Sequence, residues 1–202
     1  MAYGIGAMES PRSSLVLVRH CATDWSASGR HTSHTDLSLS AAGAIDAPHI
    51  GARLQKLTGE TFARIVASPR RRAQETCQRA GFESNVAIDD DLVEWDYGSY
   101  EGLTTPEIRA TTPTWSLWDD GAPGGESPED VQARADRFIE RSLRHADSSL
   151  VFSHGHFLRV LTARWLALPV RDGRLFALDP GSISVLGFER EQGVIRQWNQ
   201  VT

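Results

Sequence analysis

The sequence predicts an α/β fold, a three-layer α/β/α sandwich with a largely parallel central sheet and a small cap insertion over the strand ends. Short, unbroken apolar runs rich in β-branched residues recur along the chain, as is typical of strands buried on both faces. Stretches with one apolar helical face lie between these runs, and such alternation is typical of α/β layers. Polar residues follow the runs directly, at the strand ends where such sheets bind ligands.

The apolar runs predict four strands. They lie at residues 15–18, 65–67, 150–152 and 183–188. The first run ends in Arg19 and His20, and the second in Ser68. The third ends in Ser153 and His154. The carboxyl ends of three strands therefore carry the side chains most suited to chemistry.

Helices are expected between the strands. The first covers residues 40–57, where Pro48 should produce a kink. Two further helices open at Ser68 and Ser127, each a potential N-cap followed by a proline in the first turn. A fourth apolar-faced stretch covers residues 157–168.

The length of 202 residues suits one α/β domain and is too short for two. We expect residues 1–12 to form a flexible tail and residues 13–202 to form the domain. The composition changes at residues 94–127, where aromatic residues precede a stretch rich in glycine and proline. We interpret this segment as a cap insertion that covers the site. Trp115 and Trp118 either pack within it or contact a substrate.

The bulk composition excludes several classes of protein. The formal net charge of −5 argues against a nucleic-acid binder, and no apolar run approaches the roughly 18 residues of a membrane helix. The N-terminal residues lack the pattern of a secretion signal, and two cysteines at positions 21 and 77 form no disulfide framework. We therefore expect a cytoplasmic protein with neither nucleic acid nor membrane as a partner. The oligomeric state is left open, including a homo-oligomer.

The strand ends bring two histidines and at least two arginines to one edge of the sheet. Phosphoryl transfer needs positive groups around the phosphate oxygens and a nucleophile in line with the leaving group. A neutral imidazole can be that nucleophile, and a carboxylic acid can protonate the departing alkoxide. The acidic run at residues 89–91 is better explained as a charged loop. His154 and His156 lack further ligands for a metal, so we expect neither a metal site nor a cofactor.

Four sequence blocks resemble the signature of the histidine phosphatase superfamily, which includes the phosphoglycerate mutases. They occur in the family's order and span roughly residues 15–187. The blocks are Leu17 to His20 with Thr23, Ser68 to Thr76, Glu94 to Gly98 with Glu101 and Gly102, and Ser153 to Gly155. The third block also resembles that of acid phosphatases and sedoheptulose bisphosphatases, and this resemblance predicts a member of the phosphatase branch.

The resemblance implies a role for each matching residue. It makes His20 the nucleophile, His154 the second phosphate-binding histidine, and Arg19 and Arg72 the phosphate clamps. Glu94 becomes the acid for the leaving group and then the base for water. The predicted substrate-binding residues are Arg19, Thr23, Ser26, Thr32, Ser33, Arg72, Tyr97 and Gly155, the last with the start of its helix.

Two residues depart from the family pattern. Cys21 occupies the position where the family usually has glycine, beside the nucleophile, where it could crowd the site or make it sensitive to oxidation. Ser26 stands where mutases carry a phosphate-binding asparagine. Neither change removes a group that the mechanism requires.

The resulting prediction is a metal-independent phosphatase that hydrolyses small phosphomonoesters, such as sugar phosphates, through a phosphohistidine intermediate. One alternative is a phosphomutase of the phosphoglycerate mutase type, which needs cations for the carboxylate of its substrate. Residues 102–125 contain no lysine and only Arg109 as a basic residue, which favours hydrolysis. The other alternative is a phosphate-ester binding protein with weak catalysis. In every case the expected partner is a small phosphorylated metabolite.

Overall fold

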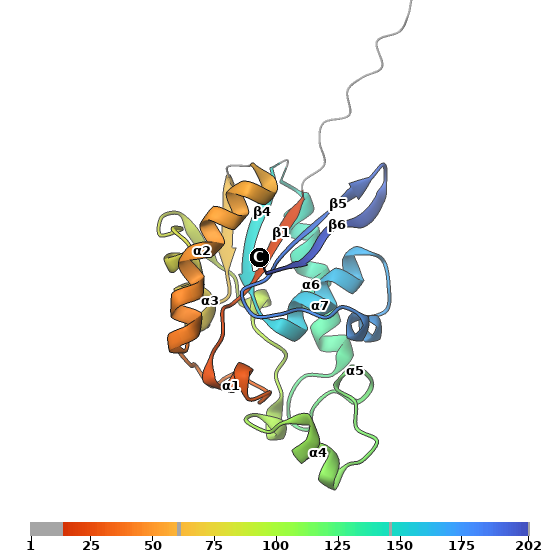
Figure 1. Cartoon of the computed structure of the whole chain (residues 1–202). Coiled ribbons are helices and arrows are strands. Elements are labelled where there is room, and N and C mark those ends of the chain that lie inside the picture. The colour runs from red at the N-terminus through yellow and green to blue at the C-terminus, as the bar shows by residue number, and fades with distance from the viewer. Residues whose placement is uncertain (1–13, 60–61, 146, 202) are drawn as a thin grey trace, which may run out of the picture.

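The computed structural model describes residues 14–59, 62–145 and 147–201, so the tail predicted at residues 1–12 lies outside the described residues. A mixed sheet of six strands in these residues has the order β3-β2-β4-β1-β5-β6 (Figure 1). The strands are β1 (Leu15–Arg19), β2 (Arg64–Ala67), β3 (Val86–Ile88), β4 (Ser149–Ser153), β5 (Ile183–Glu189) and β6 (Gln192–Gln200). The strands β1 to β4 run parallel to one another, whereas β5 is antiparallel to both of its neighbours, β1 and β6.

The central strand β1 alternates its side chains between two cores, as a strand must when helices cover both faces of the sheet. Val16 and Val18 join the core beneath α2 (Ala41–Thr58) and α3 (Arg71–Arg79). Leu15 and Leu17 join the core beneath α6 (Pro128–Leu143) and α7 (Gly155–Trp165). The three layers are visible in Figure 1, with α2 and α3 on one side and α6 and α7 on the other. This confirms the predicted sandwich and its largely parallel sheet.

Of the serines at the predicted helix starts, Ser40 and Ser127 are N-caps of helices in the structure, and Ser68 is not. Ser127 caps α6 in a capping box with Asp130, as its sequence predicts. Ser40 caps α2, which continues as one helix through Pro48. The prediction that a helix opens at Ser68 is wrong, because α3 begins at Arg71 and the Ser68 hydroxyl bonds His154 instead.

The helix predicted at residues 157–168 is displaced. It begins at Gly155 with His154 as its N-cap and ends at Trp165, so the histidine stands at the junction of strand and helix. The strands β3 and β6 were not expected. No helix of the described ranges is both long and apolar enough to cross a membrane.

The segment predicted as a cap lies at the carboxyl edge of the sheet. It contains η2 (Gly98–Tyr100), α4 (Thr105–Thr111) and α5 (Leu117–Asp120). An antiparallel bridge between Arg30 and Thr104 ties it to the loop that follows α1 (Asp24–Ala27). Trp115 is buried in the main core and Trp118 packs against that core. Short 3-10 turns at η1 (Asp90–Leu92) and η3 (Val170–Leu175) complete the fold.

Candidate active site

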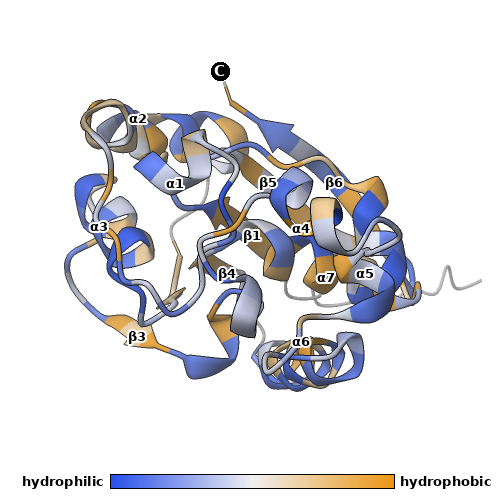
Figure 2. Ribbon diagram, turned by 90° about the horizontal axis from the view of Figure 1, so that it is seen from below, coloured by the Kyte–Doolittle hydropathy of each residue, from blue (hydrophilic) through white to orange (hydrophobic). Residues whose placement is uncertain are grey.

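Three neighbouring strand ends bring the two predicted catalytic histidines and Ser68 together. The strands β2, β4 and β1 are adjacent in the sheet, and Ser68, His154 and His20 follow them directly. The rings of His20 and His154 meet edge to face with their centroids 5.2 Å apart. His154 Nε2 lies 2.7 Å from the Ser68 hydroxyl. Figure 2 looks onto this edge of the sheet, with α1, α4 and α7 around the ends of β1 and β4.

The ring of His20 is buried and fixed. Its Nδ1 atom lies 2.7 Å from the carbonyl oxygen of Cys21, so a neutral ring donates its proton there and keeps the lone pair on Nε2. Burial lowers the pKa of His20 well below its ordinary value, and the positive charges of Arg72 and Arg19 lower it further. This arrangement favours a neutral imidazole whose Nε2 atom carries the lone pair.

Several buried nitrogen atoms near the two histidines have no hydrogen-bond partner. Among the described residues, the Nε atoms of Arg19, Arg70 and Arg72 and the Nδ1 atom of His154 are buried without a hydrogen-bond partner. Burial lowers the pKa of His154, and the three arginines and His20 lower it further. Unsatisfied buried donors of this kind are rare in folded proteins, and a tetrahedral oxyanion offers acceptors in the geometry that guanidinium groups bind. The cluster is thus suited to a phosphate group.

Arg72 also shapes the loop that follows α1. Its guanidinium is fully buried and donates to the carbonyl oxygens of Thr32 at 3.0 Å and Thr35 at 3.3 Å. Arg19 donates to the carbonyl oxygen of Leu178. Arg70 donates to the His34 ring at 3.0 Å, and its Nε atom is buried.

Glu94 enters the site from the segment after η1, and its carboxylate is bound by backbone N–H groups. The N–H of Trp95 donates to one oxygen at 3.0 Å. The N–H groups of His156 and Phe157, in the first turn of α7, donate at 3.0 and 2.8 Å. These are the free donors that any helix N-terminus offers to an anion. The start of this helix was predicted to bind substrate phosphate, whereas here these two donors hold Glu94.

A pocket of about 160 Å³ opens where these elements meet. Its lining includes seven of the predicted site residues, Arg19, His20, Thr23, Ser26, Thr32, Glu94 and Tyr97. Arg72, His154, Ser33 and Gly155 are not part of the lining. Arg72 and His154 are fully buried behind it.

The predicted polar residues differ in what their side chains contact. Ser26 forms a capping box with Thr23, which uses its hydroxyl within the first turn of α1. Thr32 donates its hydroxyl to the carbonyl oxygen of Arg30 at 3.0 Å. Ser33 donates its backbone N–H to the Glu101 carboxylate and its hydroxyl to the carbonyl oxygen of Glu94, so it packs behind the acid. The binding roles of these residues stay predictions.

Cys21 does not face the pocket. Its side chain is 1 % exposed and belongs to the core beneath α2. Burial raises the pKa of its thiol to about 11. Its backbone N–H donates to the Thr76 hydroxyl, which anchors the residue after the nucleophile to α3. The thiol is therefore accommodated in the core and does not crowd the phosphate site.

Two histidines that were not predicted as site residues, His31 and His156, lie in the pocket wall. His31 Nδ1 lies 2.7 Å from the carbonyl oxygen of Leu103, and His156 Nδ1 lies 2.6 Å from the Tyr97 hydroxyl. The two rings are stacked with centroids 6.0 Å apart, and burial lowers the pKa of both. Gly29, Arg30 and Thr105 complete the unpredicted lining. In the sequence, His156 is marked only by its nearness to His154, a spacing that resembles a metal pair.

The carboxylates and histidines considered as metal ligands have other partners. Asp89 and Asp91 form ion pairs with Arg141 at 2.8 and 2.7 Å, which agrees with a charged loop. His154 and His156 bond different residues. Across the described ranges, no three His, Cys, Asp or Glu side chains form a group that could hold a metal ion.

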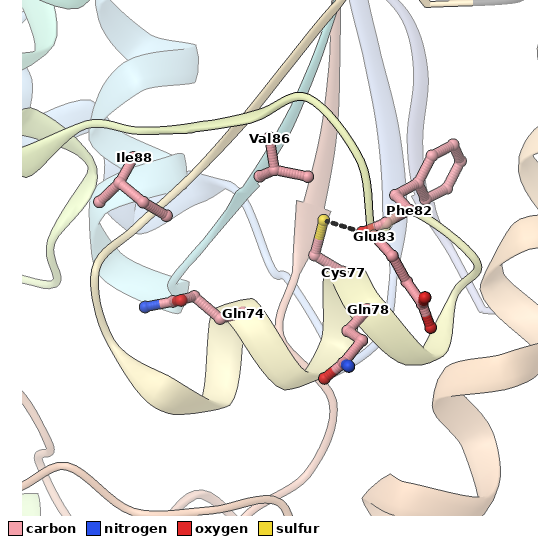
Figure 3. A pocket seen from close by; sticks show the side chains of 7 residues that line it. All are labelled: Gln74, Cys77, Gln78, Phe82, Glu83, Val86 and Ile88. Carbon is pink, nitrogen blue, oxygen red and sulfur yellow. Dashed lines mark hydrogen bonds between the residues drawn. The ribbon is translucent and has the colours of Figure 1, made fainter.

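A second pocket, of about 310 Å³, lies away from this edge, between α3 and β3 (Figure 3). It is lined by Gln74, Cys77, Gln78, Phe82, Glu83, Val86 and Ile88. The Cys77 thiol donates to the carbonyl oxygen of Phe82, and burial raises its pKa to about 12. A protonated thiol of this kind is a poor nucleophile, so the pocket does not compete as an active site.

Comparison with known proteins agrees with this geometry. Residues 15–201 match the model of the histidine phosphatase superfamily, branch 1. The chain is 44% identical over 177 residues to an acid phosphatase of Mycobacterium tuberculosis, covering 87% of this chain and 86% of that protein. It is 35% identical over 187 residues to a sedoheptulose 1,7-bisphosphatase of Saccharomyces cerevisiae, covering 77% and 68%.

A solved structure of an open reading frame of Mycobacterium tuberculosis is also similar, with a TM-score of 0.88 and 40% identity over 93% of this chain and 97% of that one. These findings support the predicted activity, that of a phosphoric monoester hydrolase acting on small phosphate esters. The site and the matched sequence together establish that the chain belongs to the histidine phosphatase superfamily, branch 1.

Proposed function

We propose that this phosphatase works through a phosphohistidine intermediate formed on Nε2 of His20. The observation that carries the proposal is the 2.7 Å contact between His20 Nδ1 and the carbonyl oxygen of Cys21. It leaves the Nε2 lone pair available in a ring that also lines the pocket. A neutral, oriented imidazole is what an attack on phosphorus requires.

The first step forms the Nε2–P bond and breaks the bond from phosphorus to the ester oxygen. Glu94 lines the same pocket and gives its proton to the departing alkoxide. Arg19, Arg72 and His154 stabilise the charge that develops on the phosphoryl oxygens. In the second step Glu94 takes a proton from water, which attacks phosphorus, and the Nε2–P bond breaks to release phosphate. No step uses a metal ion.

The lining of the pocket favours a small polyol ester, such as a sugar phosphate, as the substrate. The lining side chains are hydroxyl, imidazole, guanidinium, phenol and carboxylate groups, and none is aliphatic. Groups of this kind form hydrogen bonds with hydroxyls and gain little from an apolar leaving group. The volume of about 160 Å³ suits a metabolite rather than a macromolecule.

The composition of the cap favours hydrolysis of the phosphate ester over transfer of the phosphoryl group to a bound carboxylic acid, as in a mutase. Arg109, the one basic residue of the segment 102–125, donates its Nε–H to the carbonyl oxygen of Trp115 at 2.9 Å and does not line the pocket. A mutase needs cations there for a substrate carboxylate.

The proposed setting is the cytoplasm, where phosphorylated metabolites are abundant.

The test is a rapid-quench experiment with p-nitrophenyl phosphate in buffer that contains a chelator. We expect a burst of nitrophenol equal to the enzyme concentration and a phosphoryl group on the peptide that contains His20, detected by mass spectrometry at alkaline pH. The variant His20→Ala should show neither, whereas His49→Ala, on the exposed face of α2, should keep both. Phosphorylation of another residue, inhibition by the chelator, or binding without turnover would each contradict the proposal.

A further inference from the structure

Arg134 lies outside the pocket lining, yet its guanidinium group donates hydrogen bonds to the backbone on which Glu94 lies. The residue is 8% exposed and sits in the middle of α6. It donates to the carbonyl oxygens of Asp91 at 2.7 Å, Val93 at 3.1 Å and Glu94 at 3.4 Å. Three carbonyl groups of one short segment thus share one side chain as their donor.

Glu126 completes this arrangement from the end of the cap. Its two carboxylate oxygens accept from Nε and a terminal nitrogen of Arg134 at 2.6 and 2.8 Å, a bidentate pair. One of these oxygens also accepts the N–H of Asp96 at 2.9 Å. The backbone carbonyl of Glu126 accepts from the indole of Trp95 at 2.9 Å. The residues on both sides of Glu94 are therefore held by the same ion pair.

The Arg134 guanidinium also contacts Phe157, whose backbone N–H binds the Glu94 carboxylate. It lies over the ring of Phe157 at 4.8 Å from the ring centre. The backbone N–H of Phe157 donates to the Glu94 carboxylate at 2.8 Å. Arg134 therefore contacts both the peptide from which Glu94 projects and the residue that fixes its carboxylate.

We infer that Arg134, with Glu126, is a positioning residue that sets the location of the Glu94 carboxyl group for proton transfer to the leaving group. The inference rests on the acid role of Glu94 in the proposed function. A planar fork of five donors can satisfy three carbonyls and a carboxylate at once, whereas a lysine ammonium cannot. Misplacing a catalytic group by about 1 Å can cost on the order of 100-fold in rate.

The test compares two substrates that differ in their need for an acid. Activated p-nitrophenyl phosphate leaves with little protonation, whereas the alkyl ester glycerol phosphate depends on it. For Arg134→Lys we expect kcat to fall about 100-fold on the alkyl ester, with KM nearly unchanged and only a few-fold loss on the aryl ester. Glu126→Gln, which keeps the shape and removes the charge, should show the same selectivity.

Arg141→Lys is the matched control. Arg141 lies on the same helix and binds the same segment through Asp89 and Asp91, but not through the peptide of Glu94. We expect this variant to change both substrates alike and by little. Thermal unfolding of each variant verifies that it is folded, and Glu126→Gln serves as the test if Arg134→Lys fails to fold.

Equal losses on the two esters in folded Arg134→Lys or Glu126→Gln would overturn the inference. Glu94→Gln, measured in the same assay, separates this failure from a failure of the proposed function. If Glu94→Gln slows only the alkyl ester and the other two variants do not, the positioning role is wrong. If Glu94→Gln slows both esters equally, the acid role itself is wrong, and the inference falls with it.

Discussion

The His20 ring is oriented by the residue that follows it in the chain, because its Nδ1 atom lies 2.7 Å from the carbonyl oxygen of Cys21. Cys21 is in turn anchored by its own N–H, which donates to the Thr76 hydroxyl at 3.0 Å. The direction of the Nε2 lone pair is therefore set by α3 and by the end of β1. A nucleophile held in this way needs no reorientation when substrate binds.

The first prediction concerns the pH dependence of the rate. The pKa of His20 is lowered by burial and then by Arg72 and Arg19, so the ring stays neutral and nucleophilic at pH values below 6.5. We expect the acidic limb of kcat/KM for p-nitrophenyl phosphate to lie below pH 6.5. A profile measured from pH 4 to 8 that loses activity at or above pH 6.5 would count against a neutral His20.

The second prediction concerns stability, which should fall at low pH even though activity is kept there. Burial lowers the pKa values of His20, His31, His154 and His156 in the folded protein. Below about pH 6.5 the unfolded chain therefore takes up protons that the folded protein does not. The free energy of unfolding should fall with pH from 6.5 to 5, by at most about 1.4 kcal/mol per pH unit for each histidine.

Urea denaturation of the ligand-free protein at pH 7.5, 6 and 5 would measure this change. A free energy of unfolding that is constant or rises as the pH falls would show that the histidines are charged in the folded protein.

The third prediction concerns Glu94. Replacement by glutamine keeps the shape of the side chain and removes the proton that the leaving group receives in the proposed mechanism. We expect Glu94→Gln to lose about 1000-fold in kcat on glycerol phosphate, within the usual range for general acid catalysis. The loss on p-nitrophenyl phosphate should be far smaller, because nitrophenolate leaves without a proton. Steady-state kinetics on the two esters provide the measurement.

The fourth prediction concerns the thiols. Burial raises the pKa of Cys21 to about 11 and that of Cys77 to about 12, and both side chains are at most 2% exposed. Reaction with a disulfide reagent should be slow in the native protein and rapid for both cysteines in denaturant. Fast labelling of Cys21 in the native protein, accompanied by loss of activity, would place its thiol at the active site after all.

Much of the fold is predictable from sequence because its central strands are buried on both faces. The runs at residues 15–18, 65–67 and 150–152 correspond to β1, β2 and β4. The strands that were missed lie at the two edges of the sheet. β3 has three residues, and no residue of β3 is fully buried. β6 is partly exposed along most of its length and has no unbroken apolar run, whereas β3 is apolar but spans only Val86 to Ile88.

The site was predictable where a residue follows a strand and was missed where the cap folds over it. His20, Ser68 and His154 lie at strand ends, which the sequence marks clearly. His31 reaches the pocket because the carbonyl of Leu103, more than 70 positions along the chain, accepts from its ring. The start of α3 was placed too early for a similar reason, since Ser68 bonds the distant His154 and does not cap the helix.

The most direct test of the account is a crystal structure of the protein with bound vanadate. We expect vanadium to be bound to Nε2 of His20, with its oxygens contacting Arg19, Arg72 and His154 and one apical oxygen facing Glu94. An oxyanion bound elsewhere, or one that leaves Nε2 of His20 uncoordinated at saturation, would contradict the central claim that these groups form one phosphate site.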